Sequence, residues 1–93
     1  MTRSEDAVAV EIIGEQLHDF VWRSFLFGDA ALTFEDDASL LAEGIVDETG
    51  ILELVLFVEE TYGIQVAEGD LTPEHFYSVN SIASYVAERL AED

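Results

Sequence analysis

The sequence predicts a small all-α domain, and three observations support this expectation. Apolar residues recur at intervals of three and four over the longest periodic stretches, which is the spacing of one helix face. Serine, threonine or aspartate precedes these stretches and glycine follows two of them, as expected at helix ends. The chain has 93 residues, 49% of them apolar, which suffices for one modest core. We therefore expect a single domain over residues 1–93, folded as an antiparallel four-helix bundle.

The first helix is predicted to begin after Ser4, which would serve as its N-cap, and to end at Gly28 and Asp29. Glu5 and Asp6 fall in its first turn, where acidic side chains interact favourably with the helix dipole. The inward stripe predicted for this helix consists of Val10, Ile13, Leu17, Phe20, Val21 and Phe25.

A long connection follows, from residue 29 to residue 46, with apolar residues among acidic ones. Because long loops without any packing are uncommon in small domains, we expect it to contact the core. Residues 39–43 are expected to form a helical turn, and Trp22, Phe25 and Phe27 are expected to close the end of the core. The apolar residues of the connection are Leu32, Phe34, Leu40, Leu41 and Ile45.

A second helix is predicted from Glu48 to Tyr62, with Asp47 as its N-cap and Gly63 as its stop. The β-branched residues between positions 51 and 58 would also suit a strand, but the length of the segment and the spacing of its glutamates favour a helix. The inward face predicted for it consists of Leu52, Val55, Leu56, Val58 and Tyr62.

Two further helices are predicted near the end of the chain. Residues 71–76 form a short one, capped by Thr72, with Pro73 at the first helical position. Ser78 or Asn80 caps the last helix. Its apolar period runs through Val79, Ile82, Ala83, Val86 and Leu90.

The charge balance is strongly acidic, with 21 Asp and Glu against 3 Lys and Arg and a net charge of −18. Phosphate groups need basic partners, so we expect neither nucleic acid nor an anionic membrane surface as a ligand. The same charge favours basic patches on partner proteins and disfavours self-association, which predicts a monomer.

The absence of cysteine excludes disulfides and thiolate chemistry. Without a signal peptide or a membrane-length apolar run, the expected location is cytoplasmic.

The stretch from Asp37 to Val55, DASLLAEGIVDETGILELV, resembles the heart of an acyl carrier protein. Members of that family carry Asp-Ser-Leu, then an acidic and apolar helix, then Glu-Glu-Phe-Gly-Ile; here residues 59–64 read EETYGI. Residues 70–76 and 79–82 resemble the third and fourth helical segments of the family. The resemblance covers residues 34–90 and implies a four-helix carrier fold with three main helices, one short helix and a long first loop.

One departure from the family pattern concerns the prosthetic group. In the family, a serine follows the aspartate at the start of the second helix, and a transferase joins 4′-phosphopantetheine to its hydroxyl. Here Asp47 matches the aspartate and Glu48 falls on the serine. A glutamate has no hydroxyl for that phosphodiester, so this chain is expected to carry no arm. Thr49 is one residue out of register, about 100° around the helix, and Ser39 is a more distant substitute.

Glu48 has three interpretations. An acid in the first turn of a helix is stabilised by the dipole, by about 0.3–1 kcal/mol, so glutamate is a comfortable occupant once the serine is lost. In the second interpretation its charge imitates the phosphate of a modified carrier, and in the third its carboxylate is a covalent attachment point. Natural loss of the serine and its engineered replacement both fit the sequence.

Several acids around the second helix are candidate partner-binding residues. Solvation of a helix face is the usual role of such charge runs. The resemblance implies instead that acyl- or aminoacyl-transferring enzymes, ligases or synthases contact this helix with basic residues. The candidates are Glu43, Asp47, Glu53, Glu59 and Glu60.

The other polar residues point to no catalytic or metal site. The acidic run at residues 35–37 could hold Ca²⁺ or Mg²⁺ weakly, but it does not match a calcium-binding loop. His18 and His75 are expected to be structural, and Ser24 beside His18 makes no convincing triad in so small a bundle. We therefore expect a non-enzymatic protein.

The function predicted is that of a carrier-like module in fatty acid, polyketide or secondary-metabolite biosynthesis, which docks on its enzymes without carrying an arm. The alternative is a pseudo-carrier that acts as a scaffold or regulator through the acidic helix. In an active family member, a space between the helices shelters the acyl chain. The residues expected to line that space here are Leu52, Val55, Leu56 and Ile82.

Overall fold

The computed structural model describes residues 2–92, with side-chain environments for residues 9–72 and 75–92. Every regular element among them is helical, which confirms the all-α prediction. Between the second and third long helices lie a 3₁₀ turn, η1 (Glu68–Asp70), and a four-residue helix, α3 (Pro73–Phe76). The long helices are α1 (Thr2–Phe25), α2 (Glu48–Tyr62) and α4 (Val79–Ala91).

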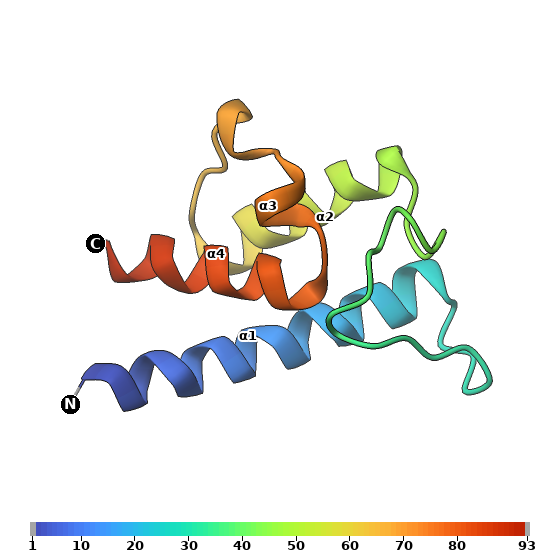
Figure 1. Ribbon diagram of the computed structural model, residues 1–93, viewed down its shortest axis with the longest axis horizontal. Coiled ribbons are helices and arrows are strands. Elements are labelled where there is room, and N and C mark those ends of the chain that lie inside the picture. The colour runs from blue at the N-terminus through green and yellow to red at the C-terminus, as the bar shows by residue number, and fades with distance from the viewer. Residues whose placement is uncertain (1, 93) are drawn as a thin grey trace.

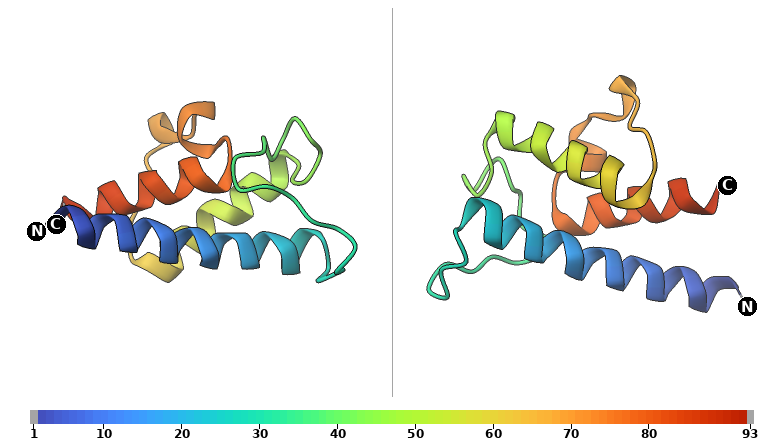
Figure 2. Two further views of the ribbon diagram at one scale, coloured as in Figure 1. Left: turned by 60° about the horizontal axis from the view of Figure 1, so that its bottom comes forward. Right: turned by 180° about the vertical axis from the view of Figure 1, so that it is seen from behind.

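Helices α1 and α4 lie side by side along the long axis of the molecule, and α2 crosses them on one side (Figure 1). Figure 2 shows that the connection between α1 and α2 wraps the end of the molecule at which α1 finishes and α2 begins. The segment from η1 to α3 forms a separate projection next to α4.

The predicted stripe of α1 is confirmed. Ile13, Leu17 and Val21 are buried, and they succeed one another at four-residue intervals along one face of the helix. The remaining members of the stripe are partly buried and pack against the core at its edges. They are Val10, Phe20 and Phe25.

The inward face of α2 differs from the prediction. Leu54, Val55 and Val58 are buried, whereas Leu52 and Leu56 are 56% and 55% exposed, so their placement in the core was wrong. Seven of the eight residues from position 51 to position 58 are apolar, so two different stripes satisfy the helical period. Packing against α1 and α4 decides which of the two stripes turns inward.

The long connection packs on the core through only part of its apolar set. Leu40 is fully buried, and its N–H donates to the carbonyl of Tyr77 at 3.0 Å. The predicted helical turn is confirmed, because Glu43 N donates to Ser39 O at 3.0 Å. The outcome for the other apolar residues is mixed: Phe34 and Ile45 pack against the core, but Leu32 and Leu41 are exposed.

Most predicted caps are confirmed. Asp47 caps α2, and Gly63 ends it with a φ of +69°. Ser78, rather than Asn80, caps α4 in a reciprocal arrangement with Ser81. At the short α3, Thr72 occupies the cap position without a side-chain capping bond.

Two expectations about α1 were wrong. The helix begins at Thr2, not after Ser4, because a serine inside a first turn costs too little to stop a helix. Phe27 does not close the core, since its side chain is 85% exposed. Phe25 does pack against the core, and Trp22 is half-buried at the same end.

Candidate functional site

The start of α2 is built by its cap residue. Asp47 has extended backbone angles, and its Oδ1 accepts a hydrogen bond from Gly50 N at 2.7 Å. Its carbonyl oxygen accepts the N–H of Ile51 at 3.0 Å. Glu48 therefore occupies the first helical position, where its exposed carboxylate lies at the positive end of the helix dipole. Thr49 is exposed beside it.

Gly50 allows α1 to approach this first turn closely. A Cβ atom at Gly50 would lie 2.5 Å from Val46 Cγ1 and 2.8 Å from Phe25 Cε1, both of which are too short for real contacts. The end of α1 thus packs directly on the first turn of α2. The sequence offered only a glycine in a helix, and nothing in the pattern identified it as a contact point.

A cavity of about 480 Å³ lies beside the start of α2. This volume falls within the range of small-ligand pockets. Its wall is mostly apolar and combines three segments of the chain. Ile51, which lines it, is one helical turn beyond Glu48 and on a neighbouring face of α2. The other lining residues are Ser39, Leu41, Ala42, Leu71, Thr72, Phe76 and Tyr77.

This cavity is not the one that the sequence predicted. Val55 and Ile82 are packed in the core, while Leu52 and Leu56 face outward, and none of these four lines the cavity. One cause is that α2 buries the other of its two apolar stripes. The second cause is the position of the segment 71–77. The orientation of that segment depends on contacts far away in the sequence.

The outward side of α2 mixes acidic and apolar residues, and we refer to it as the outer face of α2. Successive residues of a helix are about 100° apart, so positions 48, 52, 53, 56 and 60 fall within less than half a turn. All five are exposed. They are Glu48, Leu52, Glu53, Leu56 and Glu60.

The five candidate partner-binding acids are not equivalent. Glu43, Glu53 and Glu60 are exposed, and Asp47 is exposed but uses a carboxylate oxygen to cap α2. Glu59 is half-buried, and its Oε2 accepts a hydrogen bond from Val66 N at 2.9 Å. That bond holds the chain that leaves α2, so Glu59 has a structural role within the fold.

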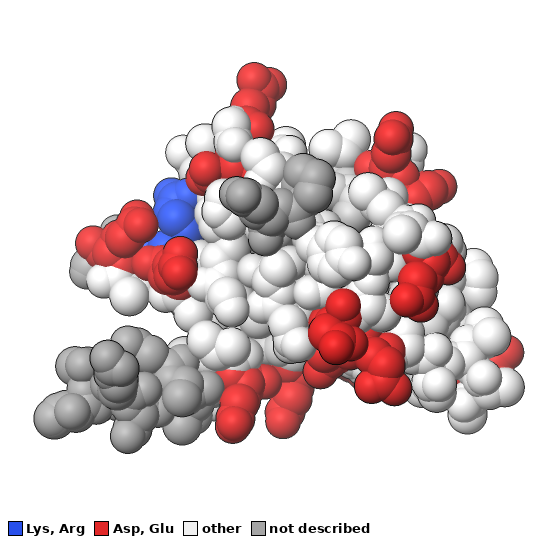
Figure 3. All heavy atoms as spheres, viewed as in Figure 1, with Lys and Arg blue, Asp and Glu red and all other residues white. Residues whose placement is uncertain are grey.

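Acidic groups dominate the surface. Figure 3 shows them around the visible face, whereas basic atoms occupy one small region. The two arginines with described side chains are both paired with acids. Arg23 Nε lies 3.1 Å from Asp19 Oδ2, and Arg89 Nη1 lies 3.8 Å from Asp70 Oδ2. The net charge of −18 is therefore presented largely by unpaired carboxylates.

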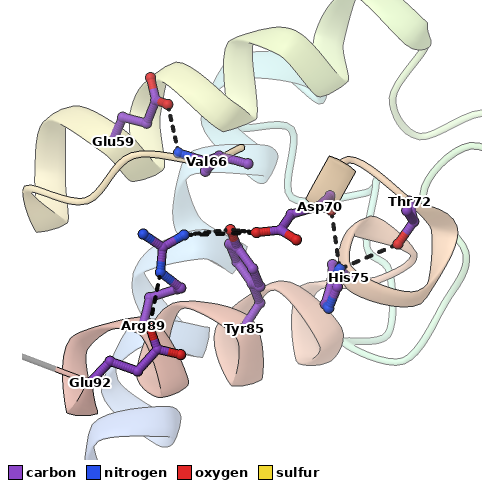
Figure 4. Close-up of polar contacts among 8 residues, drawn as sticks. All are labelled: Glu59, Val66, Asp70, Thr72, His75, Tyr85, Arg89 and Glu92. Carbon is purple, nitrogen blue, oxygen red and sulfur yellow. Dashed lines mark hydrogen bonds and ion pairs between the residues drawn. The ribbon is translucent and has the colours of Figure 1, made fainter. Parts of the chain in front are cut away.

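A polar cluster joins Asp70, the residue before the cavity-lining Leu71, to Tyr85 and Arg89 of α4 (Figure 4). The hydroxyl of Tyr85 donates to Asp70 Oδ2 at 2.7 Å and accepts from Arg89 Nη1 at 2.9 Å. His75 Nδ1 donates to the carbonyl of Asp70 at 3.1 Å, since a carbonyl oxygen can only accept. Burial, and then the bond to Asp70, raise the pKa of Tyr85 above its ordinary value of 10.0. The hydrogen bonds to Asp70 also fix the position of Leu71, the residue after it, which lies in the cavity wall.

The remaining candidate residues serve local structure. His18 Nδ1 lies 2.6 Å from Asp36 Oδ1, and its ring stacks on Phe34 with the centroids 4.2 Å apart. Ser39 Oγ accepts the N–H of Ala42 at 3.1 Å, so this hydroxyl caps the helical turn. The part of the chain with described side chains contains no cluster of metal-binding side chains. Within it, no helix has both the length and the apolar character required to cross a membrane.

The sequence matches no known family profile and no curated protein. Among solved structures, it is similar to a chain from a structure described as "Crystal structure of FAD-dependent dehydrogenase". The two chains superpose with a TM-score of 0.64 and 28% sequence identity, over 75% of this chain and 97% of the other. The matched chain is therefore shorter than this one, and nearly all of it shares this helical arrangement.

Proposed function

We propose that this chain is an acyl-carrier-like module that docks on acyl- or aminoacyl-handling enzymes without carrying a phosphopantetheine arm. Three long helices, one short helix and a long first connection fit the four-helix bundle of the carrier type. One observation carries the proposal. Position 48 lies at the exposed start of a helix, on the outer face of α2 and one helical turn from the wall of an apolar cavity.

The cavity supports an ancestry in carrying acyl groups. Its wall of leucine, isoleucine, alanine and aromatic side chains suits an aliphatic chain better than a polar ligand. An acyl group tethered at position 48 would be only one helical turn from Ile51 in that wall. A serine at this position would therefore be adjacent to a shelter for its own cargo.

The outer face of α2 supports docking. Leu52 and Leu56 are more than half exposed, even with every described element of the chain in place. A partner that buries these two side chains would remove apolar surface from water, which favours binding. The surrounding glutamates would attract a basic enzyme surface and accelerate its encounter with α2.

Glu48 is compatible with docking but not with loading. At the first helical position its charge is favoured by the dipole, so the helix retains its structure without the serine. The carboxylate also places negative charge where the phosphate of a loaded carrier would lie. A partner that contacts that phosphate with basic residues would still find a charge of the correct sign.

The proposal is tested by restoring the hydroxyl. Wild type, E48S and the double variant E48S/T49A are incubated with coenzyme A and a promiscuous phosphopantetheinyl transferase, and their intact masses are measured. We expect wild type to remain unmodified and both E48S variants to gain one phosphopantetheine group. Circular dichroism confirms that each variant is folded. A folded E48S that gains no mass, or a wild type that gains one, would contradict the proposal.

A second candidate function is suggested by the structural neighbour. In this alternative the chain is a small helical partner of a FAD-dependent dehydrogenase, because a shorter chain with this arrangement occurs in such a structure. The two candidates are distinguished by binding to a FAD-dependent dehydrogenase that acts on no carrier-bound substrate. Binding to that enzyme, together with failure of E48S to be loaded, would favour the second candidate.

A further inference from the structure

Phe27, just after α1, has a strained backbone conformation and an exposed apolar side chain, and both features cost free energy when no partner is bound. Its φ is +59°, and within the described residues it is the one non-glycine residue with a positive φ. Such a conformation is strained for a bulky side chain. Phe27 is 85% exposed, more than any other large apolar residue in the ranges 9–72 and 75–92. Glycine would avoid both disadvantages, so neither the backbone nor the core explains a phenylalanine here.

The turn that presents Phe27 is held on both sides by hydrogen bonds. The carbonyl of Trp22 accepts the N–H of Leu26 at 3.1 Å and that of Gly28 at 3.0 Å. The indole N–H of Trp22 donates to the carbonyl of Asp29, also at 3.1 Å. Because the turn is already fixed, a partner that binds the ring loses little backbone freedom on association. Strain held in place in this way is typical of functional positions.

Phe27 lies at the same end of the molecule as Glu48. Phe25, two residues earlier, packs against Gly50 in the first turn of α2. Figures 1 and 2 show the end of α1 and the start of α2 next to each other from every direction drawn. An enzyme that approaches position 48 and also extends over the end of α1 would meet the turn at Phe27.

We propose that Phe27 is a second docking contact, which inserts into an apolar pocket on the enzyme that engages the outer face of α2. The proposal rests on the proposed function, since it requires an enzyme that works at position 48. Aromatic side chains are frequent anchors at the centres of protein interfaces. Phe27 is a single protruding ring, so the complementary surface is a pocket rather than a flat patch.

Charge determines the rest of the partner's chemistry. Asp29, Asp47 and Glu48 are exposed at this end of the molecule, and Arg23 is paired with Asp19. The pocket is therefore expected to have a rim of lysine and arginine. A second copy of this chain also has a net charge of −18, so the two copies would repel each other. An anionic membrane would be repelled for the same reason.

The test compares F27G with I12A, both in the E48S background. Ile12 is 49% exposed and lies in α1, about 20 Å along the helix axis from Phe25, the last residue of that helix. The measurements are the urea midpoint of unfolding and kcat/KM for loading by the phosphopantetheinyl transferase. We expect F27G to keep or raise the midpoint, because glycine relieves the strain, and to lower kcat/KM about tenfold. For I12A we expect a kcat/KM within about twofold of its parent.

The outcomes are distinguishable. If E48S is never loaded, the proposed function fails, and this inference fails with it. If E48S is loaded and F27G is loaded equally fast, Phe27 is no docking contact although the proposed function stands. A lower urea midpoint for F27G would assign Phe27 a structural role and overturn the inference. Binding of wild type, but not F27G, to phosphatidylcholine vesicles would assign the ring to a membrane surface and also overturn it.

Discussion

Helices α4 and α2 are both rich in apolar residues, but they use them differently. In α4, Val79, Ile82 and Val86 are fully buried, and Leu90 in the last turn is the partly exposed exception. In α2, one apolar stripe enters the core, while Leu52 and Leu56 form a second stripe that faces outward. The core therefore accounts for the large apolar residues of α4 other than Leu90, but for only part of those in α2. This difference supports the proposal that the outer face of α2 is a docking surface.

The largest expected effect is a difference in stability when the same substitution, leucine to alanine, is made in each of the two stripes of α2. Leu54 is fully buried, so L54A should lower the free energy of unfolding by about 2–5 kcal/mol. Leu56 is 55% exposed, so L56A should lower it by less than about 1 kcal/mol. Urea denaturation of both variants measures the difference. Equal losses of stability would show that Leu56 belongs to the core, and the distinction between a buried and an outward-facing stripe of α2 would then be wrong.

The next effect concerns the contact between α1 and α2. The methyl group added by G50A would collide with Val46 and Phe25, so we expect a loss of about 1–3 kcal/mol. Gly69 is the matched control, because an added Cβ there would meet nothing within 4 Å. Thermal and urea unfolding should leave G69A close to wild type. A G50A protein as stable as wild type would mean that α1 and α2 can separate without cost.

The polar cluster on α4 gives an effect that depends on pH. Y85F removes the hydroxyl that bonds Asp70 and Arg89, which should cost about 0.5–1.5 kcal/mol for each bond at neutral pH. Because the pKa of Tyr85 is raised in the folded state, the folded protein holds this proton more tightly than the unfolded chain. Its contribution is complete below pH 10 and is lost as pH rises through the higher folded pKa.

Urea unfolding between about pH 8 and pH 11, a range that spans the ordinary tyrosine pKa, tests this prediction. Wild type should lose stability above pH 10 more steeply than Y85F. Part of the loss should remain in Y85F, because burial also raises the pKa of Tyr62. Parallel curves for the two proteins would show that the Tyr85 proton is not linked to folding.

The smallest effect concerns the dipole at the start of α2. E48Q removes a charge from the first turn, while E53Q removes one from the middle of the helix. Both relieve repulsion in a chain of net charge −18, but only E48Q loses a dipole interaction. E48Q should therefore be less stable than E53Q by about 0.3–1 kcal/mol, and salt should reduce the difference. Identical stabilities would leave the dipole without a role at Glu48.

The local features of the fold were predictable from the sequence. The cap at Asp47, the stop at Gly63, the stripe of α1 and the cap at Ser78 depend on residues within one or two turns of each other. Which face of α2 is buried was not predictable, because leucine, isoleucine, valine and phenylalanine occur around most of the circumference of that helix. Only tertiary contacts with the rest of the core select the buried stripe.

The site was predictable in part. Glu48 lies at the exposed first position of α2, as its place after Asp47 predicted. The cavity was misplaced because its wall joins residues 39–42, 51 and 71–77, which no local pattern connects. Phe27 could not be identified either, since the sequence placed the end of the first helix at Gly28 and Asp29, whereas the first left-handed residue is Phe27. The structural use of Glu59 was hidden for the same reason as the cavity, as its partner is the backbone of Val66 beyond the end of the helix.

The rate at which the transferase loads the E48S protein tests the central claim, that the outer face of α2 is a docking surface, most directly. E48S, E48S/L52A/L56A and the control E48S/I12A are compared by kcat/KM for phosphopantetheine transfer, with circular dichroism to confirm folding. If the outer face binds the enzyme, removal of both exposed leucines should lower kcat/KM by about tenfold or more, and I12A should change it by less than about twofold. Equal kcat/KM values for all three folded proteins would contradict the claim.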